Sequence, residues 1–149
     1  MQLNFNGTNQ TLAQAVQLAN TILRDPSFYD QIAAVPNFEY STYTGQQVAD
    51  EIRNLQQNPE VDTYWRPWSG ATAQTQTKIN INTAKLNRPL PSIVNTLLHE
   101  NTHFVDWAVN QNWDYTDRNV WEDPPLSAPY KIGAIAEAMA TQLLAGQAN

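Results

Sequence analysis

The stretch that decides the fold is TLLHENTHFV, which spans residues 96–105. It carries both histidines of the chain, His99 and His103, and between them Glu100. The flanking positions are apolar or uncharged and contain no proline, so the stretch predicts the middle of a helix over residues 92–110. Residues four apart on a helix lie one above the other, so both imidazoles leave the same helix face.

This pattern, H-E-x-x-H, has a defined metal chemistry. Two imidazoles one helical turn apart can share one zinc ion. Glu100 is rotated by about 100° from His99 around the helix axis, which brings its carboxylate close to the ion without making it a ligand. A carboxylate there can take a proton from a water that the ion has activated and pass it to a leaving amine. The alternative is a helix with two ordinary histidines, one in the core and one at the surface.

A catalytic zinc site usually needs a third protein ligand beside two histidines. The chain has no other histidine and no cysteine, so this ligand must be a carboxylate. The downstream candidates are Asp106, Asp114, Asp117, Glu122, Asp123 and Glu137. We expect Glu137, because it is the lone acid among the small and apolar residues 132–140, where an unpaired carboxylate is costly to bury. The alternative for Glu137 is a solvent-facing acid on an amphipathic helix.

Asp106 is the second candidate, because it shares the helix face of His99 and His103. It lies nearly a full turn beyond His103, however, and its side chain is short. Two other interpretations stay open for it. Asp106 accepts a hydrogen bond from an imidazole and fixes its tautomer, or it is a solvent-facing acid in the last turn of the helix.

The rest of the chain predicts helices mixed with short strands. Apolar spacing and alternation predict helices over residues 11–23, 28–34 and 130–145, and strands over residues 38–42, 61–65 and 75–83. Thr44 caps a further helix that contains Val48, Ile52 and Leu55. The last helix is expected to stop at Gly146. With no repeat and no long linker, we expect one domain over residues 1–149 with an α+β fold, several helices around a short mixed sheet.

With these residues in hand, the chain resembles the zincin metallopeptidases and, within them, the gluzincins. In that group a helix with H-E-x-x-H is followed by a second helix that donates a glutamate ligand. The matching positions are the motif at residues 99–103 and Glu137, so the resemblance covers the last third of the chain. The extension of the metzincins is absent, since Asp106 replaces its glycine and Val109 its third ligand. The resemblance implies a zincin-like domain that hydrolyses peptide bonds with one Zn²⁺.

The resemblance also implies parts of a substrate cleft. In zincins the strand before the active-site helix commonly borders the cleft and pairs with an extended substrate, and its counterpart here is Lys78 to Asn82. The family often supplies a donor to the oxyanion of the reaction. For that role we expect Tyr130, with Tyr115 as the second candidate. The alternative for Tyr130 is a packing residue at the start of a helix.

The aromatic residues outside the motif have two interpretations. Trp65, Trp68, Trp113 and Trp121 lie in loop-like surroundings. They either form a wall of the cleft or fill the core, and burial is the usual fate of any single tryptophan. The segment from Asn112 to Pro125 is expected to form a lid over the metal.

Charge and composition narrow the partners. The net charge is −6 and no basic cluster occurs, so the footprint of a nucleic-acid or anionic-lipid binder is missing. No stretch approaches the roughly 20 apolar residues of a membrane span, and the first residues lack the pattern of a secretory signal. We therefore expect a monomer that acts on a peptide or protein, without nucleic acid or membrane. It is expected in the cytoplasm or exported without a classical signal peptide.

The alternative function is a zincin-like zinc-binding module without peptidase activity that binds a protein partner. Glu100 separates the two functions, because a site that only binds has no need of a general base. The motif therefore favours the zinc metallopeptidase.

Overall fold

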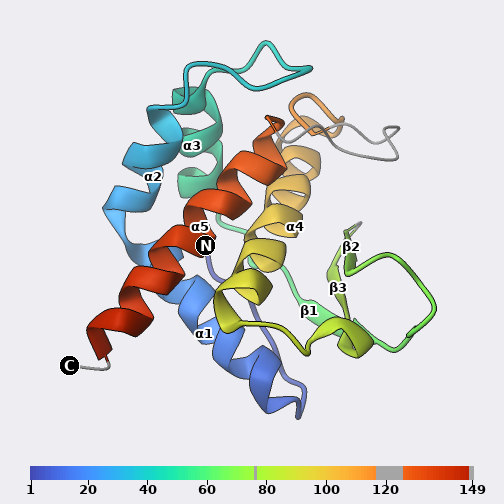
Figure 1. Cartoon of the computed structure of the whole chain (residues 1–149). Helices are drawn as coiled ribbons and strands as arrows, with labels where there is room; N and C mark the ends of the chain where they lie inside the picture. Colours follow the sequence, from blue (N-terminus) through green and yellow to red (C-terminus); the bar gives the residue numbers. More distant parts are fainter. Residues whose placement is uncertain (76, 117–125, 148–149) are drawn as a thin grey trace.

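The long helix α4 (Leu90–Asn110) is the element around which the fold is arranged. In this computed structural model, which describes residues 1–75, 77–116 and 126–147, α4 lies between a small sheet and the other helices (Figure 1). Before it come α1 (Gln10–Arg24), α2 (Pro26–Ala33), α3 (Gly45–Asn54), β1 (Val61–Tyr64), β2 (Ala73–Thr75), β3 (Ile79–Asn82) and the short 3-10 helix η1 (Thr83–Lys85), and after it comes α5 (Ala128–Gln147). The architecture is α+β, as predicted.

Local sequence explains where the helices begin. The Asn9 side chain caps α1 by accepting a hydrogen bond from the amide of Leu12. Thr44 caps α3 as predicted, and Gln47 completes a capping box with it. Pro91 lies in the first turn of α4, where its missing N–H costs nothing. At the other end of α4, Gln111 adopts a left-handed conformation with φ of 53°, which turns the chain out of the helix.

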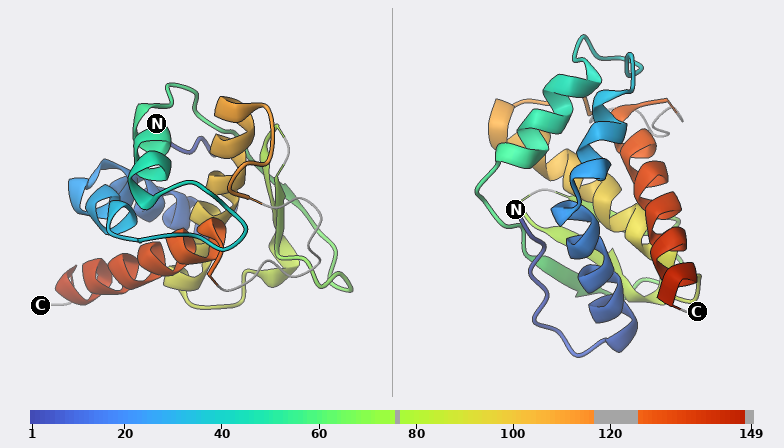
Figure 2. Two further views of the ribbon diagram at one scale, coloured as in Figure 1. Left: turned by 90° about the horizontal axis from the view of Figure 1, so that it is seen from above. Right: turned by 90° about the vertical axis from the view of Figure 1, so that its left-hand side faces the viewer.

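The core lies where the apolar faces of the helices meet the inner face of the sheet. α4 and α5 pack side by side (Figure 1), and the two perpendicular views in Figure 2 place the sheet on the opposite side of α4 from α1 and α2. Ile79 and Ile81 of β3 are fully buried, as are Ile93 and Leu97 of α4. These apolar contacts fix α4 between the two layers, which sets the position of its polar residues.

The sheet is short and mixed, as predicted, with the strand order β1-β3-β2. β1 runs parallel to β3, with Val61 opposite Ile79, and β2 runs antiparallel to β3, with Thr75 opposite Ile79. The single strand predicted over residues 75–83 is therefore wrong. Its first residue ends β2, and β3 begins only at Ile79 and runs antiparallel to β2.

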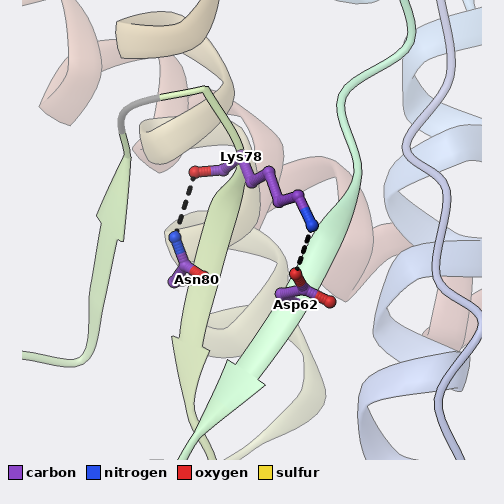
Figure 3. A network of polar contacts seen from close by, with 3 residues as sticks. All are labelled: Asp62, Lys78 and Asn80. Atoms are coloured by element: carbon purple, nitrogen blue, oxygen red, sulfur yellow. Dashed lines mark hydrogen bonds and ion pairs between the residues drawn. The ribbon is translucent and has the colours of Figure 1, made fainter.

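This topology corrects the prediction that Lys78 to Asn82 borders the substrate cleft. β3 has a neighbour on each side, so it has no open edge to offer to a peptide. Figure 3 shows β3 between the two other strands, with the Lys78 ammonium 2.8 Å from the Asp62 carboxylate on β1. Asn80 donates a hydrogen bond to the Lys78 carbonyl. The edge strand next to α4 is β2.

The strand predicted over residues 38–42 is not formed. Phe38 is buried, but Tyr40, which should share its face, is 76% exposed and has a left-handed φ of 57°. That conformation is incompatible with an extended strand. The alternation of apolar and polar residues here arises because one residue of the loop, Phe38, is buried in the core.

The helices predicted around the motif are found, with small differences at their ends. α4 begins at Leu90, two residues before the predicted start, and α5 spans Ala128–Gln147 and continues through Gly146, where we predicted it to stop. Within the described ranges, no helix combines the length and apolarity that a membrane span requires. Residues 117–125 of the predicted lid lie outside the described residues.

Candidate metal centre

The two histidines of α4 face each other one helical turn apart. Their Nε2 atoms are 3.3 Å from one another, and the ring planes are tilted by 58°. Both side chains are half-buried at the surface of the helix. Two nitrogens bound to one tetrahedral zinc at about 2.0–2.1 Å lie roughly 3.3–3.4 Å apart. The imidazoles of His99 and His103 thus stand at the spacing that a shared zinc ion requires.

Glu100 lies beside this pair and turns toward the sheet. Its side chain is only 9% exposed, and its Oε2 accepts a hydrogen bond of 2.6 Å from the hydroxyl of Thr75 at the end of β2. That distance is typical of a hydroxyl bound to a charged carboxylate. Burial raises the pKa of the Tyr64 hydroxyl on β1, and the charge of Glu100 raises it further. The carboxylate of Glu100 therefore interacts with both edge strands of the sheet, by a hydrogen bond with Thr75 on β2 and electrostatically with Tyr64 on β1.

Tyr130 lies next to the histidines from the first turn of α5. Its ring meets that of His99 edge to face, with centroids 4.8 Å apart and planes at 88°. Tyr130 is 42% exposed, so it lies at the surface beside His99. The structure thus brings Tyr130 to the predicted place, and its role as oxyanion donor stays a prediction.

Tyr115, the second candidate for the oxyanion, is placed differently. Only 2% of it is exposed, and its ring packs against that of Tyr43 at 5.2 Å. Burial strongly raises the pKa of its hydroxyl, and the carboxylates of Glu51 and Asp106 raise it further. A hydroxyl enclosed in this way does not face a substrate, so the interpretation of Tyr115 as a donor is wrong.

Trp113 lies next to His103. Its indole lies 5.9 Å from the ring of His103 and 5.4 Å from the ring of Trp107, measured between centroids. Trp65 and Trp68 are instead 64% and 79% exposed, so they do not fill the core. Trp121 lies outside the described residues. The ring of Trp113 thus lies against His103, and the interpretation of Trp113 as a wall of a cleft stays a prediction.

Glu137 on α5 contacts α4 one helical turn before the histidines. Its Oε2 accepts a hydrogen bond of 2.7 Å from Asn95, which precedes His99 by one helical turn. Gly133 makes this close approach possible, because a Cβ atom there would collide with the Asn95 side chain. Among the residues that the structure describes, no three His, Asp or Glu side chains converge as a metal site. The structure thus brings His99 and His103 together and places Glu137 against Asn95, one helical turn before His99, and the role of all three as ligands stays a prediction.

The other acidic candidates divide into two groups. Asp117, Glu122 and Asp123 lie outside the described residues. Asp106 is fully buried, so its interpretation as a solvent-facing acid is wrong. Its carboxylate accepts hydrogen bonds from the amides of Asp114, Tyr115 and Thr116, and from the Thr116 hydroxyl. It thereby holds the turn after α4, and with it Trp113.

Sequence reasoning missed Thr75 and Asn95, which bond to Glu100 and Glu137. Each of them lies on a different helix or strand from the glutamate it bonds to, so no spacing in the sequence predicts these contacts. Asp106 did carry a signal. A carboxylate in the last turn of a helix opposes the helix dipole, which indicates that the side chain has partners elsewhere.

Comparisons of the chain with protein-family models, with curated proteins and with solved structures found no match. The functional assignment therefore rests on the residues of this site and their geometry.

Proposed function

We propose that the chain is a zinc-dependent metallopeptidase with a zincin-like, gluzincin-type site. The observation that carries the proposal is the 3.3 Å separation of the Nε2 atoms of His99 and His103, with Glu100 next to them on the helix. A mutual hydrogen bond between the imidazoles also produces this distance. The neighbouring carboxylate, buried and aligned by Thr75, is what favours a hydrolytic site over a mere histidine pair.

The residues divide the chemistry as follows. A zinc ion on His99 and His103 would polarise the scissile carbonyl and lower the pKa of the attacking water. Glu100 takes the proton of that water and delivers it to the leaving amine. Tyr130, whose ring contacts that of His99, donates a hydrogen bond to the oxyanion. Trp113 covers the side of His103 and limits access of bulk water there.

Glu137 is proposed as the third ligand. It is bonded to Asn95, which precedes His99 by one helical turn on α4. A rotation of the flexible glutamate side chain would turn its carboxylate toward the histidines. Asn95 would then hold one carboxylate oxygen while the other faces the ion, which is the usual support of a ligand by a neighbouring donor.

The open edge of β2 is the proposed place of the peptide substrate. The amide of Asn82 donates to the carbonyl of Thr72, so the backbone polar groups of Ala73 and Thr75 point away from β3 by the alternation of an antiparallel ladder. A substrate added as a further strand would bond to these groups. Because Thr75 contacts Glu100, such a strand would pass next to the general base.

Two measurements on the purified protein test this function. Metal analysis is expected to find about one zinc per chain, and the zinc-loaded protein is expected to cleave members of a quenched-fluorescence peptide library. Glu100→Gln should keep the zinc and lose cleavage by at least about 100-fold, since a general base contributes roughly 10²–10⁴. Cleavage that survives in Glu100→Gln would refute the mechanism.

The third ligand needs its own comparison. Glu137→Ala should lower the zinc content markedly, whereas Gln142→Ala, an exposed position on the same helix, should not. Full zinc retention in Glu137→Ala would remove Glu137 from the ligand set. The acids at positions 117, 122 and 123 would then be replaced one at a time in the same assay.

The second candidate function is a zinc-binding module that binds a protein and cleaves nothing. The observation in its favour is the exposed pair Trp65 and Trp68, whose indoles meet edge to face at 5.8 Å on the surface. Exposed tryptophans are frequent contact residues in protein interfaces. A zinc-loaded wild type that cleaves no peptide of the library would favour this function.

A further inference from the structure

We propose that Thr75 is a positioning residue for Glu100, and that it ties the orientation of the general base to the edge strand on which a peptide would lie. The inference rests on the proposed function and adds a residue to it. Thr75 lies 25 residues before Glu100 in the chain and reaches it through the fold alone.

The bond itself has the character of a strong one. Thr75 Oγ1 lies 2.6 Å from Glu100 Oε2, within the range of about 2.5–2.7 Å for a hydroxyl that donates to a charged carboxylate. Glu100 is 9% exposed, so water contributes little to the solvation of its carboxylate. A donor from the sheet therefore compensates part of the cost of burying this charge.

The bond also fixes an orientation that the glutamate side chain does not fix by itself. The last torsion of a glutamate is broad, so the carboxylate plane turns easily when no partner holds it. A hydrogen bond to one named oxygen, Oε2, selects one rotation of that plane. A general base must stand within hydrogen-bond distance of the proton it takes, and small misplacements cost large factors in rate.

The register of the sheet explains why Thr75 serves this role. Thr75 is paired with Ile79, which is fully buried and faces α4, so the two side chains share the inner face of the sheet. A slip of the register by one residue would turn the hydroxyl away from the helix. The backbone of Thr75 meanwhile faces the open edge. A peptide that pairs there would order the same residue whose hydroxyl orients the base.

The kinetic test uses Thr75→Val, which keeps the shape and removes the hydroxyl, and Thr75→Ser, which keeps it. With the zinc-loaded protein and one cleaved library peptide, Thr75→Val should lower kcat by about 10–100-fold, in line with the cost of small misplacements, while the zinc content stays that of the wild type. Thr75→Ser should recover most of the lost kcat. Thr63→Val, an exposed threonine on β1, is the matched control and should behave as the wild type.

A second readout is independent of activity. In metal-free protein, urea unfolding of the wild type, Thr75→Val, Glu100→Ala and the double variant forms a double-mutant cycle. The hydrogen bond predicts a coupling of about 10-fold or more in the unfolding constant, the size expected for a bond to a charged group. Additive effects in the cycle would overturn the bond, and an unchanged kcat in Thr75→Val would overturn the positioning role. Absence of cleavage by the zinc-loaded wild type would instead refute the proposed function.

Discussion

Two polar regions of α4 lie about one helical turn apart and are held in opposite ways. At His99 and His103 the side chains are half-buried, and their ring nitrogens face each other at 3.3 Å. At Asp106 the carboxylate is fully buried and accepts hydrogen bonds from the backbone amides that follow the helix. The same helix thus carries a site that faces outward and a polar anchor that faces inward.

The difference shows how the fold separates a candidate metal ligand from a structural acid. The carboxylate oxygens of Asp106 accept hydrogen bonds from the backbone amides of residues 114–116. Without them, these amides would be buried with no partner. The imidazoles of the histidines stand at a partly exposed surface at the spacing of two ligands of one ion. Residue type alone does not separate the two cases, since the sequence also made Asp106 a candidate ligand. The burial of the side chain and the kind of group it bonds to do separate them.

The largest effect is expected when the inner anchor is removed. Asp106→Ala should lower the free energy of unfolding by about 3–5 kcal/mol, because several buried amides lose their acceptor at about 1–3 kcal/mol each. Urea denaturation measures the change. Asp106→Asn keeps one acceptor oxygen and should lose less, and Asp30→Ala, an exposed acid on α2, should change little. A wild-type midpoint for Asp106→Ala would show that the carboxylate does not hold the turn.

The histidine pair should behave in the opposite way. In metal-free protein, His99→Ala is expected to change the free energy of unfolding by only about 1 kcal/mol, the scale of its ring contact with Tyr130. With free zinc about 100-fold above its dissociation constant, the wild type should gain about 3 kcal/mol and the variant nearly none. Unfolding curves with and without a chelator provide the measurement. A large loss in metal-free His99→Ala would make the pair a structural element like Asp106.

The sequence predicts the helices of this fold far better than its strands. The ends of α1, α3 and α4 follow from apolar spacing and from caps such as Thr44, all of which are local features. The strands depend on partners that lie elsewhere in the chain. Residues 38–42 alternate correctly and form no strand, whereas the single strand predicted at 75–83 includes the end of β2 and the whole of β3. Alternation of apolar and polar residues indicates which side chains are buried, but it does not indicate which strand the backbone pairs with.

The same distinction applies to the site: contacts within one helix were predictable, and contacts between elements were not. His99, Glu100 and His103 were predictable, because their juxtaposition needs only one helix. The bonds of Thr75 to Glu100 and of Asn95 to Glu137 join residues 25 and 42 positions apart, and they needed the fold. The edge strand was assigned to β3 for the same reason, since strand order is set by pairing and leaves no mark on the strand itself.

A smaller effect is expected at the third polar contact of α4, between Asn95 and Glu137. Gly133→Ala places a Cβ atom against the Asn95 side chain and 3.1 Å from the Asn95 backbone oxygen. Overpacking of about 1–3 kcal/mol is opposed by about 1 kcal/mol of helix propensity, so a net loss of about 1 kcal/mol is expected. Gly146→Ala is the matched control, since a Cβ there meets no atom within 4 Å, and it should not destabilise α5. Thermal unfolding compares the two. Equal stabilisation by both variants would mean that α4 and α5 do not need the glycine.

The smallest effect concerns the surroundings of Asp106 and depends on pH. Burial is the main cause that raises the pKa of the Glu51 carboxyl, and the charges of Asp106 and Asp114 add to it, against a hydrogen bond from Asn110. A raised pKa means that the folded protein binds more protons than the unfolded chain as the pH rises through the window above 4.5, so stability falls across that window. Glu51→Gln keeps a carbonyl for Asn110 and removes the charge. It should therefore unfold at higher urea than the wild type at pH 7, and the difference should shrink as the pH falls toward 4.5. A gain in stability that does not depend on pH would mean that the charge of Glu51 does not destabilise the folded protein near Asp106. The contrast with the outward-facing histidines would then rest on Asp106 alone.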